Sequence, residues 1–262
     1  MKGMAPSGAT PPPFVRLAAH HLRWQLIGEL ATSDRRVREL VASVGQPQNL
    51  VSYHLRLLRE AELVTRTRST FDARDGYYHL DLDRCAAMLA AAGSAVHPAL
   101  QLDRTSPTAT PAGRSRRPRV LFACTGNSAR SPMAEALLRD RGRDAVEVTS
   151  AGSHPRERIH PSVVRVLADD YGIDIAGQGP RHLDTMTGRS FDYVITLCDK
   201  VREVCPEFAG HPRHIHWSIP DPATDGGRAA EAAVRRTAQD IDARIGHLLH
   251  VLPTTDRQEV HA

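Results

Sequence analysis

Residues 119–142 read RVLFACTGNSARSPMAEALLRDRG, and this stretch decides the fold of the C-terminal half of the chain. Residues 119–123 are almost entirely apolar, as expected of a strand buried on both faces. The segment from Ser131 onward predicts a helix, because Pro132 suits the first helical position and Gly142 suits the position just after the last turn. The stretch therefore predicts a strand, a loop over residues 124–130 and a helix.

The loop between this strand and helix predicts an oxyanion site with a nucleophile in it. A loop wound around a helix N-terminus turns its N–H groups inward and adds the positive end of the helix dipole. Arg130 can hold the same anion through two hydrogen bonds, and the field favours a thiolate at Cys124, whose pKa we expect well below that of free cysteine. Ser128 and Ser131 are candidate donors to the sulfur. The remaining residues of the predicted anion-binding loop are Thr125, Gly126, Asn127, Ser128 and Ala129.

A nucleophile that attacks an oxyanion needs an acid to protonate the departing oxygen. Asp221 is our candidate, because it lies between two prolines after an apolar run that ends at Ile219. Asp225, four residues later, is the alternative.

The rest of this half alternates between strand and helix patterns. We expect strands over 145–151, 191–197 and 214–219, and helices over 160–172 and 229–252. This alternation predicts an α/β domain with a parallel sheet over residues 118–253.

The N-terminal half, residues 14–96, has the pattern of a winged helix-turn-helix. Residues 14–31 predict one amphipathic helix and residues 35–44 a second helix that ends at Gly45. The stretch QNLVSYHLRLLREAELV, which follows Pro47, predicts the recognition helix. Two β-prone runs, 63–70 and 77–82, with a turn at residues 75–76 predict the wing, and a last helix covers about 83–92. The candidate DNA contacts are the outward polar and basic residues, Asn49, Ser52, Tyr53, Arg56, Arg66 and Arg68. The alternative is a winged helix that binds protein and never contacts DNA.

Composition sets the remaining expectations. Residues 97–117 are rich in Pro, Ser, Thr and Arg and predict a flexible linker. The first residues lack the apolar stretch of a signal peptide, and no run is long enough to span a membrane, so we expect a cytoplasmic protein with no membrane partner. A net charge of +4 fits an anionic partner, and the absence of a C-x2-C pair argues against a metal site.

The N-terminal segment resembles the arsenic-repressor (ArsR) family of winged-helix regulators, through NLVSYHLRLLREAELV and the wing. The resemblance implies a homodimer paired through the first and last helices and bound to a palindromic duplex DNA operator. The metalloid sensors of that family carry a C-x-C pair at the helix-turn-helix. Here the segment has only Cys85, in an Ala-rich helix, which we interpret as a buried apolar residue.

The C-terminal segment resembles the low-molecular-weight protein tyrosine phosphatases, through LFACTGNSARSPMAEA, TSAGS and the Asp-Pro near the end. That resemblance implies a four-stranded parallel sheet with the anion loop at the end of its first strand. The arsenate reductase branch is more similar. Its loop sequence is closer, no aromatic residue follows Asp221-Pro222, and Cys198 and Cys205 have the spacing of the thioredoxin-coupled enzymes.

The resemblance implies a three-thiol relay with no bound cofactor. Cys124 attacks arsenate while Asp221 acts as the acid; Cys198 then attacks Cys124 and releases arsenite. Cys205 next attacks Cys198, and an external thiol reductant such as thioredoxin reduces the resulting disulfide. The alternative for Cys198 and Cys205 is that both are structural thiols.

Two other functions remain open at this point. The first is a protein tyrosine phosphatase fused to the regulator, which needs only one thiol. The second is a transcription factor whose C-terminal domain senses an oxyanion, arsenate or phosphate-like, without turning it over.

Overall fold

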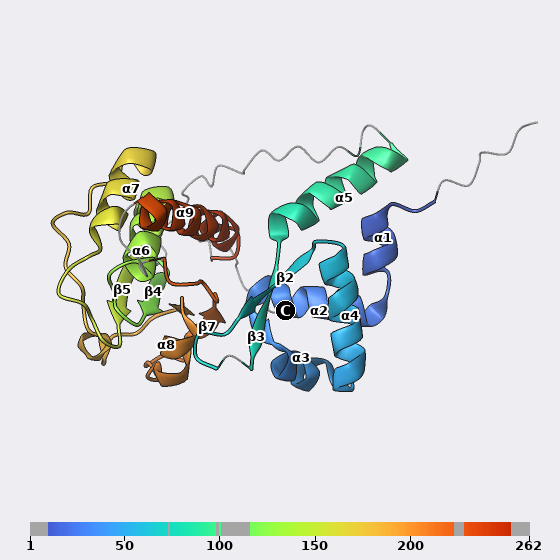
Figure 1. Cartoon of the computed structure of the whole chain (residues 1–262), viewed down its shortest axis with the longest axis horizontal. Coiled ribbons are helices and arrows are strands. Elements are labelled where there is room, and N and C mark those ends of the chain that lie inside the picture. The colour runs from blue at the N-terminus through green and yellow to red at the C-terminus, as the bar shows by residue number, and fades with distance from the viewer. Residues whose placement is uncertain (1–9, 73, 98–99, 101–115, 223–227, 253–262) are drawn as a thin grey trace, which may run out of the picture. The chain divides into compact units, whose positions relative to one another are not determined.

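A computed structural model describes residues 10–72, 74–97, 100, 116–222 and 228–252 (Figure 1). The chain divides into two compact units, one of Met1–Arg68 with Asp75–Pro107 and one of Ser69–Arg74 with Thr108–Ala262. Nearly all of the predicted linker, residues 97–117, lies outside the described residues, as does the N-terminal leader.

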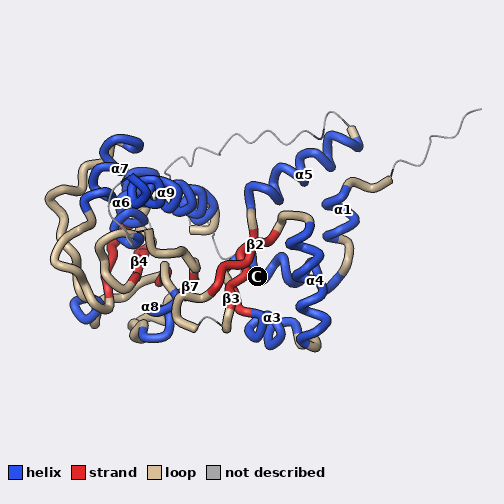
Figure 2. The backbone as a smooth tube through the Cα atoms, in the orientation of Figure 1, coloured by secondary structure: helices blue, strands red, loops and turns tan. Residues whose placement is uncertain are grey.

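The N-terminal unit is a mainly helical domain with a small antiparallel sheet, as predicted. Its elements are α1 (Pro13–Ala18), α2 (His21–Thr32), β1 (Arg35–Arg36), α3 (Val37–Val44), α4 (Gln48–Glu60), β2 (Val64–Arg68), β3 (Gly76–Leu80) and α5 (Leu82–Val96). The strand order is β1-β3-β2, with β2 and β3 forming the wing (Figure 2). Gly45 ends α3 with φ at +64°, the left-handed conformation that glycine adopts most readily.

The prediction of one helix over residues 14–31 is wrong. The chain turns at Ala19 and His20, and a new helix begins at His21. The His20 side chain accepts a hydrogen bond from the Leu22 N–H at 3.2 Å, so it caps α2 and makes the break a stable helix start. Apolar periodicity runs across this break, because α1 and α2 both bury leucine or phenylalanine in the same core.

The C-terminal unit is an α/β domain around a four-stranded sheet, as predicted. Its strands are β4 (Arg119–Cys124), β5 (Glu147–Gly152), β6 (Tyr193–Thr196) and β7 (Arg213–His216), all parallel and in the order β5-β4-β6-β7. Its helices are α6 (Arg130–Gly142), α7 (Pro161–Tyr171), α8 (Asp199–Val204) and α9 (Arg228–Leu249), with 3-10 turns at Arg143–Ala145 and Leu183–Met186. Because β4 is a central strand, its C-terminal end has neighbours on both sides.

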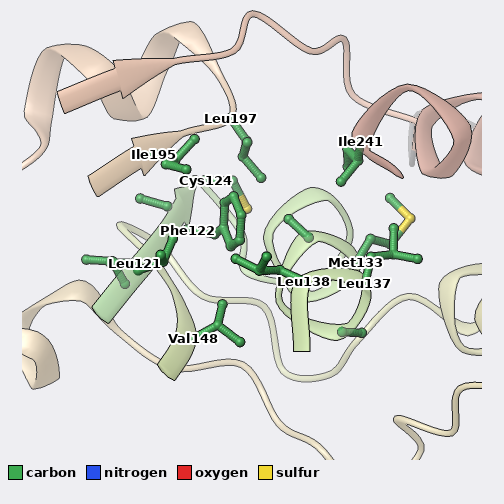
Figure 3. Packing of buried hydrophobic residues seen from close by; sticks show 14 of the residues in the cluster. Leu121, Phe122, Cys124, Met133, Leu137, Leu138, Val148, Ile195, Leu197 and Ile241 are labelled. Carbon is green, nitrogen blue, oxygen red and sulfur yellow. The ribbon is translucent and has the colours of Figure 1, made fainter. Parts of the chain in front are cut away.

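The core of this unit lies between the sheet and the helices α6 and α9. Leu121 and Phe122 of β4 are fully buried and point to opposite sides of the strand, with Phe122 facing Leu138 of α6 (Figure 3). Ile241 of α9 lies close to Met133 on the other side of α6 (Figure 3). Phe122 and Leu138 are 0% exposed, so the strand and the helix that flank the loop are held rigidly.

The C-terminal unit differs from the sequence prediction in three details. Helix α6 begins at Arg130 and not at Ser131, so Pro132 is the third helical residue, where a missing N–H still costs no internal hydrogen bond. Gly142 is the last residue of α6, and a β-carbon there would come within 2.3 Å of Val146, so close packing rather than a helix cap requires glycine. Helix α8 was not predicted, because its six residues bury only Asp199 and Val201 and so show no helical period.

Candidate active site

The anion-binding loop turns its N–H groups inward because its carbonyl oxygens are bound from outside. The carbonyls of Cys124, Thr125, Gly126 and Ser128 accept hydrogen bonds from the backbone N–H groups of Ser153, His154, Arg156 and His160, at 3.2, 2.9, 2.9 and 2.8 Å. With the carbonyls held outward, the loop N–H groups are free to face a ligand, and the start of α6 adds its positive dipole end. Residues 153–160, which provide these donors, were not identified from the sequence, since these hydrogen bonds use only their backbone N–H groups.

Asn127 holds the middle of the loop in an unusual conformation. Its φ is +42°, in the left-handed region, and its side chain is 1% exposed. The side-chain amide nitrogen donates to the hydroxyls of Ser131 and Ser150, both at 2.9 Å, while the amide oxygen accepts from the Arg181 N–H at 2.7 Å. These three bonds fix the tight turn of the loop.

Cys124 lies at the end of β4, 2% exposed, with its Sγ 2.9 Å from the hydroxyl oxygen of Ser131. The expectation that its pKa lies below that of free cysteine is wrong for this structure. Burial raises the pKa of the Cys124 thiol, and this outweighs the Arg130 guanidinium and the Ser131 hydrogen bond, which both lower it. The nearby Cys198 raises it further. Arg130 and Ser131 are therefore the two side chains that favour the thiolate.

Arg130 is buried at the start of α6 and pairs with Asp221. Its Nη1 donates to the Ile219 carbonyl at 3.0 Å, and its Nη2 donates to the Asp221 carboxylate at 2.9 Å. The Arg130 Nε is buried and has no hydrogen-bond partner among the described residues. Asp221, half exposed, thus lies at the same site as Cys124 and Arg130 although it is far away in sequence. Asp225, the alternative acid, lies outside the described residues.

Cys198 and Cys205 flank α8. Cys198 is the N-cap residue of that helix and 2% exposed, and its Sγ lies 3.3 Å from the hydroxyl oxygen of Thr125 in the anion-binding loop. Cys205 is the C-cap residue and is half-buried; burial raises the pKa of its thiol to about 11. The structure therefore brings Cys198 to the loop and leaves Cys205 at the far end of the helix.

A cavity opens over the loop. Cys124, Arg130, Cys198 and Asp221 all line it. Its lining also includes the side chains of His154, Arg156, Arg158, His160 and Lys200. No Phe, Tyr or Trp lines it in the part of the chain that the structure describes. The described residues also hold no group of three His, Cys, Asp or Glu side chains placed to bind a metal ion.

The sequence profile of the low molecular weight phosphotyrosine protein phosphatases matches residues 119–259, more than half of the chain. The chain belongs to this family. The profile of the bacterial regulatory protein arsR family matches residues 20–66, so the phosphatase-family domain follows an ArsR-type helix-turn-helix domain. Both resemblances drawn from the motifs are confirmed.

Among curated relatives of this phosphatase-family chain are two arsenate reductases. The protein from Halalkalibacterium halodurans is 35% identical over 128 residues, which cover 48% of this chain and 91% of the relative. The protein from Bacillus subtilis is 34% identical, with the same coverage. Among solved structures, the arsenate reductase of Archaeoglobus fulgidus is 31% identical with a TM-score of 0.43, covering 50% of this chain and 98% of its own. A low molecular weight protein tyrosine phosphatase from T. tengcongensis is 27% identical with a TM-score of 0.44, covering 52% and 99%.

The predicted DNA-contacting residues lie on the surface of the ArsR-type domain. Asn49, Ser52, Tyr53 and Arg56 are exposed on α4, whose opposite face buries Val51, Leu55 and Leu58. The Arg56 guanidinium lies over the Tyr53 ring, 5.4 Å from its centre. Arg66 and Arg68 are exposed on β2 of the wing. Cys85 is buried in α5, and burial raises the pKa of its thiol to about 11. No described helix of the chain is long and apolar enough to cross a membrane.

Proposed function

We propose that the phosphatase-family domain reduces arsenate to arsenite by a relay of three thiols. The observation that carries this proposal is the position of Cys198, whose sulfur lies beside the Thr125 hydroxyl at the edge of the loop that holds Cys124. A phosphatase needs one thiol in its anion loop, and a second thiol beside that loop is what a redox reaction needs. The similarity to proteins named arsenate reductase supports the same conclusion.

The first step is substitution at arsenic. The Cys124 thiolate forms a bond to arsenic, and one arsenate oxygen leaves as water with a proton from Asp221. The buried Nε of Arg130, which has no partner among the described residues, and the inward N–H groups of the loop are the donors for the remaining oxygens. The Asp221 carboxylate accepts a hydrogen bond from Arg130 in this structure, so the acid is already placed beside the anion site.

The next steps are thiol exchange. Cys198 attacks the Cys124 sulfur, the sulfur–arsenic bond breaks, and its electron pair stays on arsenic, which leaves as arsenite in the As(III) state. The two thiols are oxidised to a Cys124–Cys198 disulfide. Cys205 then attacks Cys198 and frees Cys124, and a dithiol reductant of the thioredoxin class reduces the Cys198–Cys205 disulfide.

Helix α8 must unwind during this relay. Residues seven apart in an α-helix are separated by about 10 Å along the axis, at about 1.5 Å per residue. A disulfide needs Cα atoms roughly 4.4–6.8 Å apart. Cys198 and Cys205 therefore cannot join while α8 is helical. A helix of six residues has little stability of its own, so unwinding α8 costs little free energy.

The lining of the cavity fits a small inorganic oxyanion better than an aryl phosphate. Arg156, Arg158 and Lys200 attract either dianion, but the described lining offers no Phe, Tyr or Trp to stack on an aryl ring. We therefore place inorganic oxyanions first among substrates.

The test is NADPH oxidation by the full chain with arsenate, thioredoxin and thioredoxin reductase, and p-nitrophenyl phosphate hydrolysis by the same preparation. We expect arsenate-dependent NADPH loss that Cys198→Ser abolishes. Cys205→Ser should release one arsenite per chain and then stop. Rapid hydrolysis of the aryl phosphate without NADPH loss, unaffected by either substitution, would make the domain a phosphatase.

We also propose that the ArsR-type domain binds duplex DNA as a homodimer, with α4 in the major groove and Arg66 and Arg68 on phosphates. Support comes from the exposed polar face of α4 and from the match to regulators of the arsR family. The domains would then be residues 14–96 and 118–253, joined by a linker over 97–117. Since one proposed function needs DNA and the other needs reduced thiols, we place the protein in the cytoplasm.

Binding can be tested by fluorescence anisotropy with a duplex from the promoter region of its own gene, and dimerisation by sedimentation. A Cys124→Ala chain that still responds to arsenate on that duplex would favour the oxyanion-sensor function over the enzyme.

A further inference from the structure

A buried carboxylate that binds two arginines, Glu135, has no role in the relay. Glu135 of α6 is 1% exposed, and its two carboxylate oxygens bind different arginines. Arg181 donates to Oε2, and Arg139 donates to Oε1. A buried carboxylate is costly unless it is paired, so its presence here calls for an explanation.

Hydrogen bonds connect Glu135 to the nucleophile. The Ser150 hydroxyl bonds to Glu135 Oε2 at 2.6 Å, and the Asn127 amide nitrogen donates to Ser150 at 2.9 Å. The same nitrogen donates to the Ser131 hydroxyl at 2.9 Å, and Ser131 lies 2.9 Å from the Cys124 sulfur. We call Glu135, Ser150, Asn127 and Ser131 the support chain.

The donors in the support chain can be assigned from its chemistry. An amide nitrogen only donates, so the oxygens of Ser131 and Ser150 must both accept from Asn127. Each hydroxyl then has one hydrogen left to give. Ser150 gives its hydrogen to the Glu135 carboxylate, and Ser131 gives its hydrogen to Cys124, the direction that stabilises a thiolate.

Arg181 forms hydrogen bonds to three members of the support chain, Asn127, Ser150 and Glu135. Its backbone N–H donates to the Asn127 amide oxygen at 2.7 Å, which fixes which way the amide faces. Its Nε donates to the Ser150 carbonyl at 3.0 Å, and its Nη2 binds the carboxylate oxygen to which Ser150 also donates. Arg139, by contrast, donates hydrogen bonds to the other carboxylate oxygen of Glu135 and to the Val148 carbonyl.

We propose that Arg181 is a positioning residue for Cys124, acting through the support chain. Its guanidinium binds the Glu135 oxygen to which Ser150 donates, and so fixes that oxygen as the acceptor at the start of the support chain. Without it, Arg139 would hold the carboxylate only by the other oxygen, and the Ser150 hydroxyl would lose its fixed acceptor. Ser150 would then hold the Asn127 amide less firmly, and the hydrogen that Ser131 gives to Cys124 would no longer be fixed. The inference rests on the proposed function only in taking Cys124 as the nucleophile.

The test is the rate of iodoacetamide alkylation of Cys124 against pH in the full chain, followed by the mass of its peptide. We expect Arg181→Ala to move the midpoint to higher pH and to slow the reaction below it about tenfold, the change that one unit of thiol pKa produces. Arg181→Lys should restore part of the rate because it keeps the charge. Arg139→Ala, the matched control, should leave the profile unchanged.

A second pair of variants separates positioning from a general loss of structure. In a Ser131→Ala background the support chain no longer reaches Cys124, so Arg181→Ala should have no further effect on the midpoint. An added shift there, or equal profiles for Arg181→Ala and Arg139→Ala, would overturn the inference. Protection of Cys124 by inorganic phosphate in the unsubstituted chain is measured alongside. If phosphate fails to protect, the proposed oxyanion site fails, whatever Arg181 does.

Discussion

The backbone of Gly152 lies so close to Thr125 that a β-carbon at position 152 would come within 2.6 Å of the Thr125 carbonyl oxygen. The same carbon would be 2.8 Å from the Asn127 nitrogen. The end of β5 thus supports the anion-binding loop from behind, with no room for a side chain.

Gly152→Ala should therefore displace the loop. We expect loss of phosphate protection of Cys124 and at least a tenfold lower rate of arsenate reduction, roughly the effect of a misplacement near 1 Å at a reacting centre. The control is Gly177→Ala, because a β-carbon there has no atom within 4 Å and should change neither value. Phosphate protection that is unchanged in Gly152→Ala would contradict this view of the loop.

Asp221→Asn should lower the turnover number for arsenate by about a hundredfold or more, the usual size of a general acid's contribution. Inhibition by phosphate should change much less, since Arg130 and the loop remain. Asp225→Asn is the comparison, as it tests the alternative acid in the same segment. A larger loss in Asp225→Asn than in Asp221→Asn would reverse the assignment.

Cys205 should react with iodoacetamide slowly in the reduced chain, and not at all after one equivalent of arsenate, when the relay has joined it to Cys198. Burial raises the pKa of the Cys205 thiol to about 11, so near neutral pH almost all of it is protonated and unreactive. Unwinding of α8 removes that burial and returns the pKa toward about 8.5, which raises the thiolate fraction about three hundredfold and lets Cys205 attack the Cys124–Cys198 disulfide.

The measurement is alkylation of each cysteine peptide before and after one equivalent of arsenate, without reductant. Cys85 serves as the internal control, because burial also raises its pKa to about 11 and it lies in the other domain. Equal rates for Cys205 in the two states would argue against a relay that passes through α8.

Arg56→Ala should weaken binding to the promoter duplex and reduce its salt dependence. If Arg56 contacts a phosphate, the slope of log affinity against log salt should fall by about 0.9. Arg84→Ala is the control, because Arg84 lies on α5 and pairs with Glu62. An unchanged slope in Arg56→Ala, measured by anisotropy over a range of salt, would remove this residue from the DNA interface.

The parts that were predictable from sequence are those whose signal is local. Cys124, Arg130 and the flanking strand and helix lie within twenty-four consecutive residues, and the structure has that strand, loop and helix in order. The break between α1 and α2 was missed, because the His20 side chain caps α2 and histidine is not among the residues that usually mark a helix start. Glu135 and Arg181 lie 46 positions apart, and nothing in the sequence joins them.

The pKa of Cys124 shows a different kind of failure. Arg130 and Ser131 were identified correctly as groups that favour a thiolate, but the degree of burial of the sulfur depends on how β4 packs, and this is a property of the folded core. Local motifs identify which groups act, whereas their balance needs the tertiary structure.

The position of Cys198 and Cys205 at opposite ends of α8 has a consequence for the energetics of reduction. Every hydrogen bond and packing contact that stabilises the helix favours the dithiol, so the folding free energy of α8 adds to the reduction potential of the pair. Substitutions on the exposed face of this one turn, far from any sulfur, should then move that potential in proportion to helix propensity. The stability of the six-residue helix α8 would then set how strongly the Cys198–Cys205 disulfide oxidises the external reductant.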